Sequence, residues 1–120
     1  MDYYHRDAAS LGQDAKLPLL KLGDSGEVFY ELALEMFREI AKNNEAGRHT
    51  VFIVPVGPVG QYPIFVRLVN RERLSLKQTW FLNMDEYLDR EGRWIDKNSP
   101  LSFHGFMERA VYNQLSPELV

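Results

Sequence analysis

The chain has 120 residues, a net charge of −3 and no cysteine. This length suits one domain with a hydrophobic core and is too short for two. Basic residues are scattered among acidic ones, which disfavours a nucleic-acid partner, and no apolar run approaches the ~20 residues that cross a membrane. Without cysteine the chain has no disulfide and no thiolate metal site, so we expect a cytoplasmic protein.

The first part of the chain predicts a strand followed by a helix. Residues 17–22 (LPLLKL) are short and apolar with a proline, which is typical of an edge strand. Asp24 or Ser25 then offers an N-cap. Over residues 28–40 the apolar side chains recur every three or four positions, so they predict an amphipathic helix.

Two further strands are predicted from apolar runs. Residues 50–56 (TVFIVPV) are apolar at consecutive positions, which predicts a central parallel strand that is buried on both faces. A glycine-rich loop follows, and residues 62–70 predict a helix with Pro63 in its first turn. Residues 78–83 (QTWFLN) predict the next strand. A last helix with an apolar stripe is expected over residues 103–114, with Ser99 or Ser102 as its cap.

This alternation of strands and helices predicts an α/β fold with a parallel sheet and helices on both of its faces. Three strands are fewer than an open α/β sheet usually carries, so we expect an incomplete, N-terminal portion of such a fold. Residues 1–16 show no hydrophobic period and are expected to form an N-terminal extension. Residues 17–120 are expected to form the α/β part.

Two segments at predicted strand ends are candidates for a binding site. The loop Gly57-Pro58-Val59-Gly60 is either a tight structural turn or a cradle whose backbone N–H groups bind an anion. Asp85 and Glu86 are either solvated acids of a surface turn or part of a pocket, where a carboxylate can act as a general base. Adjacent carboxylates point in different directions, so at most one should reach a ligand while the other caps or pairs. The three histidines lie too far apart in sequence to predict a metal site.

These segments resemble a known family. Residues 54–57 (VPVG) and 81–87 (FLNMDEY) are similar to the N-terminal half of glucosamine-6-phosphate deaminase (isomerase), in the superfamily that includes 6-phosphogluconolactonase. The NMDEY pentapeptide at residues 83–87 is the specific part and favours the amino-sugar branch. Residues 100–107 (PLSFHGFM) are similar to the family's Pro-x-Ser-Tyr-x-x-Phe-Met. The resemblance covers roughly residue 17 to the C-terminus.

The resemblance implies a Rossmann-like three-layer α/β/α sandwich and a sugar-phosphate ligand. The family reaction opens the ring of glucosamine 6-phosphate, isomerises aldose to ketose and releases ammonia, which gives fructose 6-phosphate. Asp85 matches the family's aspartate that moves a proton between C2 and C1. No metal or organic cofactor is expected. The residues expected to bind the substrate are Gly57, Pro58, Val59, Gly60, Glu86 and Tyr87.

The chain also departs from the family pattern. The family loop Thr-Gly-Gly/Ser-Thr-Pro is replaced by Val56-Gly57-Pro58-Val59-Gly60, which lacks the hydroxyl groups. The family's Asp-Gly-His…Asn-Glu-Pro segment is not among the 120 residues, so we expect Asp85 to be half of an active site and the chain to be inactive by itself. Three alternatives stay open: a non-catalytic sugar-phosphate binding or sensing module, a 6-phosphogluconolactonase-like hydrolase, and a fragment whose sheet edge pairs with another chain, including a homo-oligomer.

Overall fold

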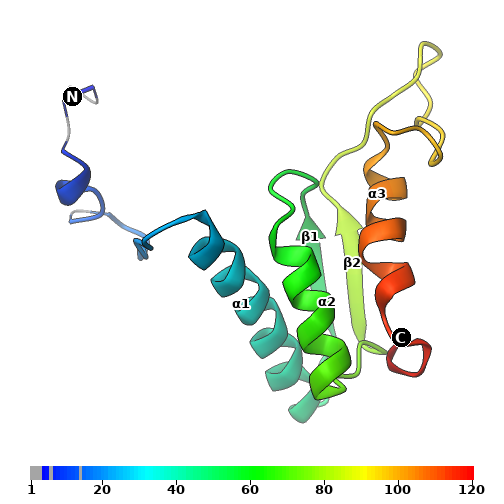
Figure 1. Cartoon of the computed structure of the whole chain (residues 1–120), viewed down its shortest axis with the longest axis horizontal. Coiled ribbons are helices and arrows are strands. Elements are labelled where there is room, and N and C mark those ends of the chain that lie inside the picture. Colours follow the sequence, from blue (N-terminus) through cyan, green and yellow to red (C-terminus); the bar gives the residue numbers. More distant parts are fainter. Residues whose placement is uncertain (1–3, 6, 14) are drawn as a thin grey trace.

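The computed structural model describes residues 4–5, 7–13 and 15–120 of the chain (Figure 1). Helices predicted over residues 28–40 and 62–70 and strands predicted over residues 50–56 and 78–83 are confirmed, with ends shifted by a few residues. In chain order the elements are η1 (Ala8–Ser10), α1 (Ser25–Glu45), β1 (Thr50–Val54), α2 (Gln61–Glu72), β2 (Thr79–Asn83), α3 (Phe103–Ala110), η2 (Tyr112–Gln114) and η3 (Pro117–Leu119).

Helix α1 begins with a side-chain N-cap, as the turn residues before it predict. The Asp24 carboxylate accepts a hydrogen bond from the Glu27 backbone N–H at 2.9 Å, which confirms Asp24 as the N-cap. Glu27 in turn accepts from the Gly23 N–H at 2.7 Å. These bonds satisfy N–H groups that have no partner inside the helix. The apolar face of α1 buries Ala33 and Ile40 completely.

Strands β1 and β2 pair in parallel, and helix α2 connects them. The register places Thr50 opposite Thr79 and Val54 opposite Asn83, so both strands end at the same edge of the sheet. The Met84 N–H donates to the Val54 carbonyl at 2.9 Å and extends the pairing past the end of β2. The loops that follow the two strands therefore leave from one edge, as the parallel arrangement predicts.

The edge strand predicted at residues 17–22 is wrong. This segment has no strand structure and leads away from the body of the molecule (Figure 1). Leu17 and Leu20 are 78% and 68% exposed. A short apolar run forms a strand only where a neighbouring strand and a buried face are available, and within the described residues this segment has neither. The boundary expected between residues 16 and 17 stays a prediction.

The expectation that residues 50–56 are buried on both faces is also wrong. Thr50 and Val54 are buried, but Val51 and Ile53 between them are 54% and 64% exposed. In β2 the side chain of Trp80 lies on the same open face and is 63% exposed. The helices therefore cover one face of the sheet. An α/β arrangement with a parallel sheet is confirmed, and a three-layer sandwich is not.

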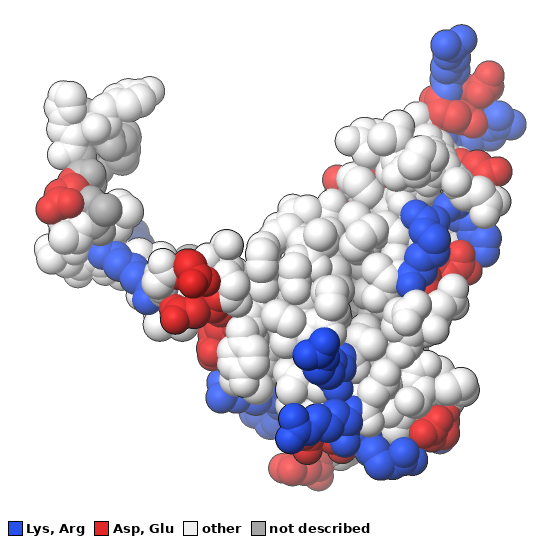
Figure 2. All heavy atoms as spheres, in the orientation of Figure 1, with Lys and Arg blue, Asp and Glu red and all other residues white. Residues whose placement is uncertain are grey.

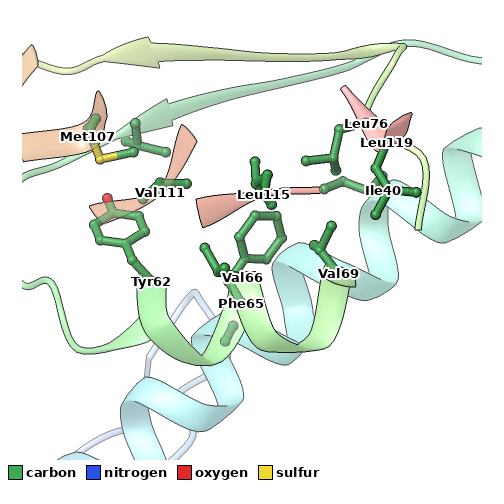
Figure 3. Packing of buried hydrophobic residues seen from close by; sticks show 12 residues of the cluster. Ile40, Tyr62, Phe65, Val66, Val69, Leu76, Met107, Val111, Leu115 and Leu119 are labelled. Carbon is green, nitrogen blue, oxygen red and sulfur yellow. The ribbon is translucent and has the colours of Figure 1, made fainter. Parts of the chain in front are cut away.

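The hydrophobic core lies between the covered face of the sheet and the helices (Figure 3). The Phe81 ring of β2 lies 6.0 Å from the Phe65 ring of α2 and 6.1 Å from the Tyr112 ring, centroid to centroid. These aromatic contacts hold β2 against both α2 and the C-terminal segment. The most fully buried apolar side chains are Ala33, Ile40, Tyr62, Phe65, Val69, Met107 and Val111.

Helix α3 ends earlier than its apolar stripe predicts. It stops at Ala110, and a single 3-10 turn, η2, follows. Of the two predicted caps, Ser102 is confirmed: its side-chain oxygen accepts a hydrogen bond from the Gly105 N–H at 3.1 Å. Ser102 is only 1% exposed, so this cap is buried against the body of the molecule.

Charged side chains of both signs gather toward the lower and outer parts of the face drawn in Figure 2.

Among the described residues, no helix is both long and apolar enough to span a membrane. Nor do the described residues contain a group of three or more His, Asp or Glu side chains that could hold a metal ion.

Candidate functional site

A cavity of about 730 Å³ lies beside the carboxyl end of β2. Its volume is within the range of small-molecule sites, and its position is where parallel α/β sheets bind ligands. The lining is mainly apolar and aromatic, with a few polar side chains among them. The lining residues are Phe81, Leu82, Asn83, Met84, Asp85, Glu86, Trp94, Ile95, Lys97, His104 and Tyr112.

Asp85 reaches this cavity with a free carboxylate. It follows β2 by two positions, and its side chain is exposed. In the described part of the chain, no hydrogen bond or ion pair engages the Asp85 carboxylate. An unengaged carboxylate on the wall of a cavity can accept a proton from a bound molecule. This placement fits the role predicted for Asp85, which itself stays a prediction.

Glu86 lines the same cavity, but the protein engages its carboxylate. One oxygen, Oε1, accepts hydrogen bonds from the backbone N–H groups of Tyr87 at 2.9 Å and Phe103 at 3.0 Å. The other, Oε2, accepts from the Ser102 hydroxyl and from the His104 N–H, both at 2.9 Å. Adjacent carboxylates were expected to differ in this way, one free and one capping. Substrate binding by Glu86 stays a prediction.

These hydrogen bonds also decide the ionisation of Glu86. Partial burial opposes the charged form, but the N–H groups of His104, Phe103 and Tyr87 and the Ser102 hydroxyl together outweigh it. The pKa of Glu86 is therefore held below its ordinary value. Because the bonds come from the first turn of α3, the negative charge also lies where the helix dipole favours it.

The cavity lining also includes two basic residues, Lys97 and His104. The Lys97 ammonium forms an ion pair with Glu108 at 2.8 Å, and its hydrogen bond lowers the pKa of that carboxyl despite some opposing desolvation. The sequence analysis gave neither Lys97 nor His104 a role in the site. The signal that could have found His104 is its place two residues after the Ser102 cap.

The glycine-rich loop lies at the same sheet edge but does not line this cavity. Two of its carbonyl groups already accept hydrogen bonds, that of Pro58 from the Gln61 side chain at 3.0 Å and that of Val59 from the Tyr62 N–H at 3.2 Å. Gly57 has a φ of 148°, a conformation that favours glycine. A Cβ added at Gly57 would have no neighbouring atom within 4 Å. Binding of an anion by this loop stays a prediction.

Tyr87 also lies outside the cavity lining. Its ring centroid is 5.1 Å from that of Phe103, at an angle of 56°. This contact joins the segment after β2 to the start of α3, next to the Glu86 hydrogen bonds. Of the site residues predicted from the sequence, the structure thus brings Asp85 and Glu86 to the cavity. It leaves Gly57, Pro58, Val59, Gly60 and Tyr87 outside its lining.

Comparison with known proteins gives one relevant similarity. The chain is 33% identical over 64 residues to a glucosamine-6-phosphate deaminase of Borrelia garinii subsp. bavariensis. No protein-family profile matches the chain. The match covers 52% of the chain but only 22% of the relative's length. The chain is therefore similar, over about half of its residues, to one part of a glucosamine-6-phosphate deaminase.

Proposed function

We propose that the chain is part of a glucosamine-6-phosphate deaminase-like enzyme, in which Asp85 transfers the proton between C2 and C1 of the sugar. One observation carries the proposal: the Asp85 carboxylate lies free on the wall of a cavity at the carboxyl end of a parallel strand. The residues around Asp85 resemble this family, and the similarity to a deaminase over 64 residues supports the same assignment.

In the proposed reaction the carboxylate takes the proton from C2 of the open-chain amino sugar and returns it to C1. The resulting ketose form carries nitrogen at C2, and water displaces that nitrogen as ammonia, which leaves fructose 6-phosphate. General acid–base catalysis of this kind contributes roughly 10²–10⁴-fold to a rate. This catalysis needs a carboxylate that is unpaired and that lies within hydrogen-bond reach of the reacting carbon. The Asp85 carboxylate is unpaired, so it meets the first condition.

The apolar lining suits the same chemistry. Phe81, Trp94 and Ile95 contribute to the wall around Asp85. A sugar bound against such side chains would displace water from them, and electrostatic interactions strengthen where water is displaced. Lys97 and His104, which also line the cavity, offer hydrogen-bond donors to the sugar or to its phosphate.

A non-catalytic sugar-phosphate binding module is the second candidate, because the glycine-rich loop departs from the family loop that it resembles. It lacks the hydroxyl groups of that loop, and Pro58 has no N–H to offer a phosphate. A site of this kind would hold a sugar phosphate without turning it over. A 6-phosphogluconolactonase-like hydrolase differs from the deaminase-like enzyme and from the binding module because it would hydrolyse 6-phosphogluconolactone.

The test is an assay of the purified protein, as its own gene encodes it, with glucosamine 6-phosphate. The proposal expects ammonia and fructose 6-phosphate in equal amounts. Thermal stabilisation by the sugar phosphate without ammonia release would support the binding module instead. Hydrolysis of 6-phosphogluconolactone without ammonia release would support the lactonase alternative.

A further inference from the structure

The Glu86 carboxylate connects two parts of the cavity wall that are distant in sequence. It belongs to the segment after β2, and three of its hydrogen-bond donors lie at residues 102, 103 and 104, at the start of α3. A carboxylate that accepts several N–H bonds at a helix start is a charge-assisted cap, which is stronger than a neutral one. The start of α3 is thereby tied to the end of β2.

A second, steric contact holds the start of α3 from another side. Gly105 is buried, and a Cβ at this position would lie 1.9 Å from the Lys97 carbonyl oxygen. The backbone at Lys97 can approach the helix this closely because residue 105 is a glycine. The first turn of α3 is therefore enclosed by the end of β2 and by the Lys97 loop.

The same three segments carry the polar groups of the cavity. Asp85 precedes Glu86, Lys97 lies in the loop against Gly105, and His104 lies in the first turn of α3. The His104 backbone N–H donates directly to Glu86 Oε2. The hydrogen bonds of Glu86 therefore act directly on His104, the residue of α3 that lines the cavity.

We infer that Glu86 is a positioning residue: its carboxylate fixes the start of α3 and so holds His104 on the wall of the cavity that Asp85 also lines. The inference rests on the proposed function insofar as this cavity is the substrate site. Glu86 itself need not touch the substrate. Its role is to keep an imidazole donor at a constant place relative to the carboxylate that moves the proton.

The test compares Glu86→Ala with Asp24→Ala, each measured in the whole protein. Asp24 caps α1 through the Glu27 N–H, so its replacement also removes a carboxylate cap but lies outside the cavity lining. Amide hydrogen exchange at Phe103 and His104 reports the cap, and the ring resonances of His104 report its placement. We expect Glu86→Ala to speed exchange at both amides at least tenfold and to shift the ring resonances. Asp24→Ala should change neither.

Glu86→Gln sharpens the test because it keeps the shape of the side chain. The amide oxygen of the glutamine can accept bonds, but its NH₂ group cannot. We therefore expect one of the two amides, of Phe103 or of His104, to stay protected while the other exchanges faster.

Unchanged exchange in Glu86→Ala would overturn the inference, and so would faster exchange with unmoved His104 ring resonances. Both measurements need no substrate, so they decide the inference even if the wild-type protein releases no ammonia. In that case the proposed function fails by itself. Where turnover is present, Glu86→Ala should lower kcat by about tenfold or more with a smaller change in KM, because a misplaced donor acts in the transition state.

Discussion

Asp85 and Glu86 are neighbours in the chain, yet the protein engages only one of their carboxylates. Glu86 accepts hydrogen bonds from Tyr87, Ser102, Phe103 and His104, whereas the Asp85 carboxylate has no partner among the described residues. Both residues line one cavity. The pair therefore combines a group that is free to react with a group that shapes the wall around it.

The hydrogen bonds of Glu86 predict a specific dependence of stability on pH. Since the folded-state pKa of Glu86 lies below its ordinary value of 4.5, the ionised side chain stabilises the fold above the unfolded-state pKa. That contribution is lost as the pH falls below 4.5 and through the folded-state pKa. We expect Glu86→Gln to be less stable than the wild type at pH 7, with the difference shrinking in acid. Chemical unfolding of both proteins at several pH values measures the difference in their free energy of unfolding. A difference that stays constant from pH 7 into acid would contradict the role given to the Glu86 charge.

The close approach at Gly105 predicts a steric effect. In Gly105→Ala the new methyl group would overlap the Lys97 carbonyl oxygen, which is backbone and cannot rotate away. Overpacking costs about 1–3 kcal/mol, more than the gain of up to ~1 kcal/mol in helix propensity. We therefore expect a net loss of unfolding free energy, measured by urea titration.

Gly26→Ala is the matched control, because Gly26 also lies in a helix. There a Cβ would meet only Asp24 Oδ1, the capping side-chain atom, at 3.1 Å, and a shift of a few tenths of an ångström relieves that contact. Its unfolding free energy should change by less than about 1 kcal/mol. Equal losses of unfolding free energy in Gly105→Ala and Gly26→Ala would show that the close approach of Lys97 to Gly105 does not cause the effect.

The open face of the sheet predicts a contrast between two large apolar side chains. Phe65 is fully buried in the core, whereas Ile53 is 64% exposed. Phe65→Ala should lower the free energy of unfolding by about 3–5 kcal/mol, and Ile53→Ala by less than about 1 kcal/mol. A cost for Ile53→Ala close to that of Phe65→Ala would mean that something covers this face in solution.

Sequence periodicity predicted the helices well because their apolar faces repeat locally. The 3.6-residue pattern located α1 and α2, and the turn residues located Asp24 as a cap. Strands were harder, because a run of consecutive apolar residues does not show which face is covered. Val51 and Ile53 have the residue types of a buried strand, but no helix in the described part of the chain packs on their side.

The candidate site shows the same limit. The motif around Asp85 identified the carboxylates, and the difference in direction between neighbouring side chains predicted that one of them would cap. The partner of that cap could not be predicted, because Ser102 and His104 lie 16 and 18 residues away from Glu86 in sequence. The same holds for Asn43, which is buried within α1 and donates to the Thr50 hydroxyl at 3.1 Å. Such contacts depend on tertiary packing and have no local pattern.

The central claim is that Asp85 transfers the proton, and the most direct measurement is turnover of glucosamine 6-phosphate by Asp85→Asn. The control is Glu45→Gln, which removes the same charge at an exposed residue at the end of α1. We predict that Asp85→Asn lowers kcat roughly 10²–10⁴-fold while Glu45→Gln leaves it unchanged. Turnover of Asp85→Asn within a fewfold of the wild type would contradict the account.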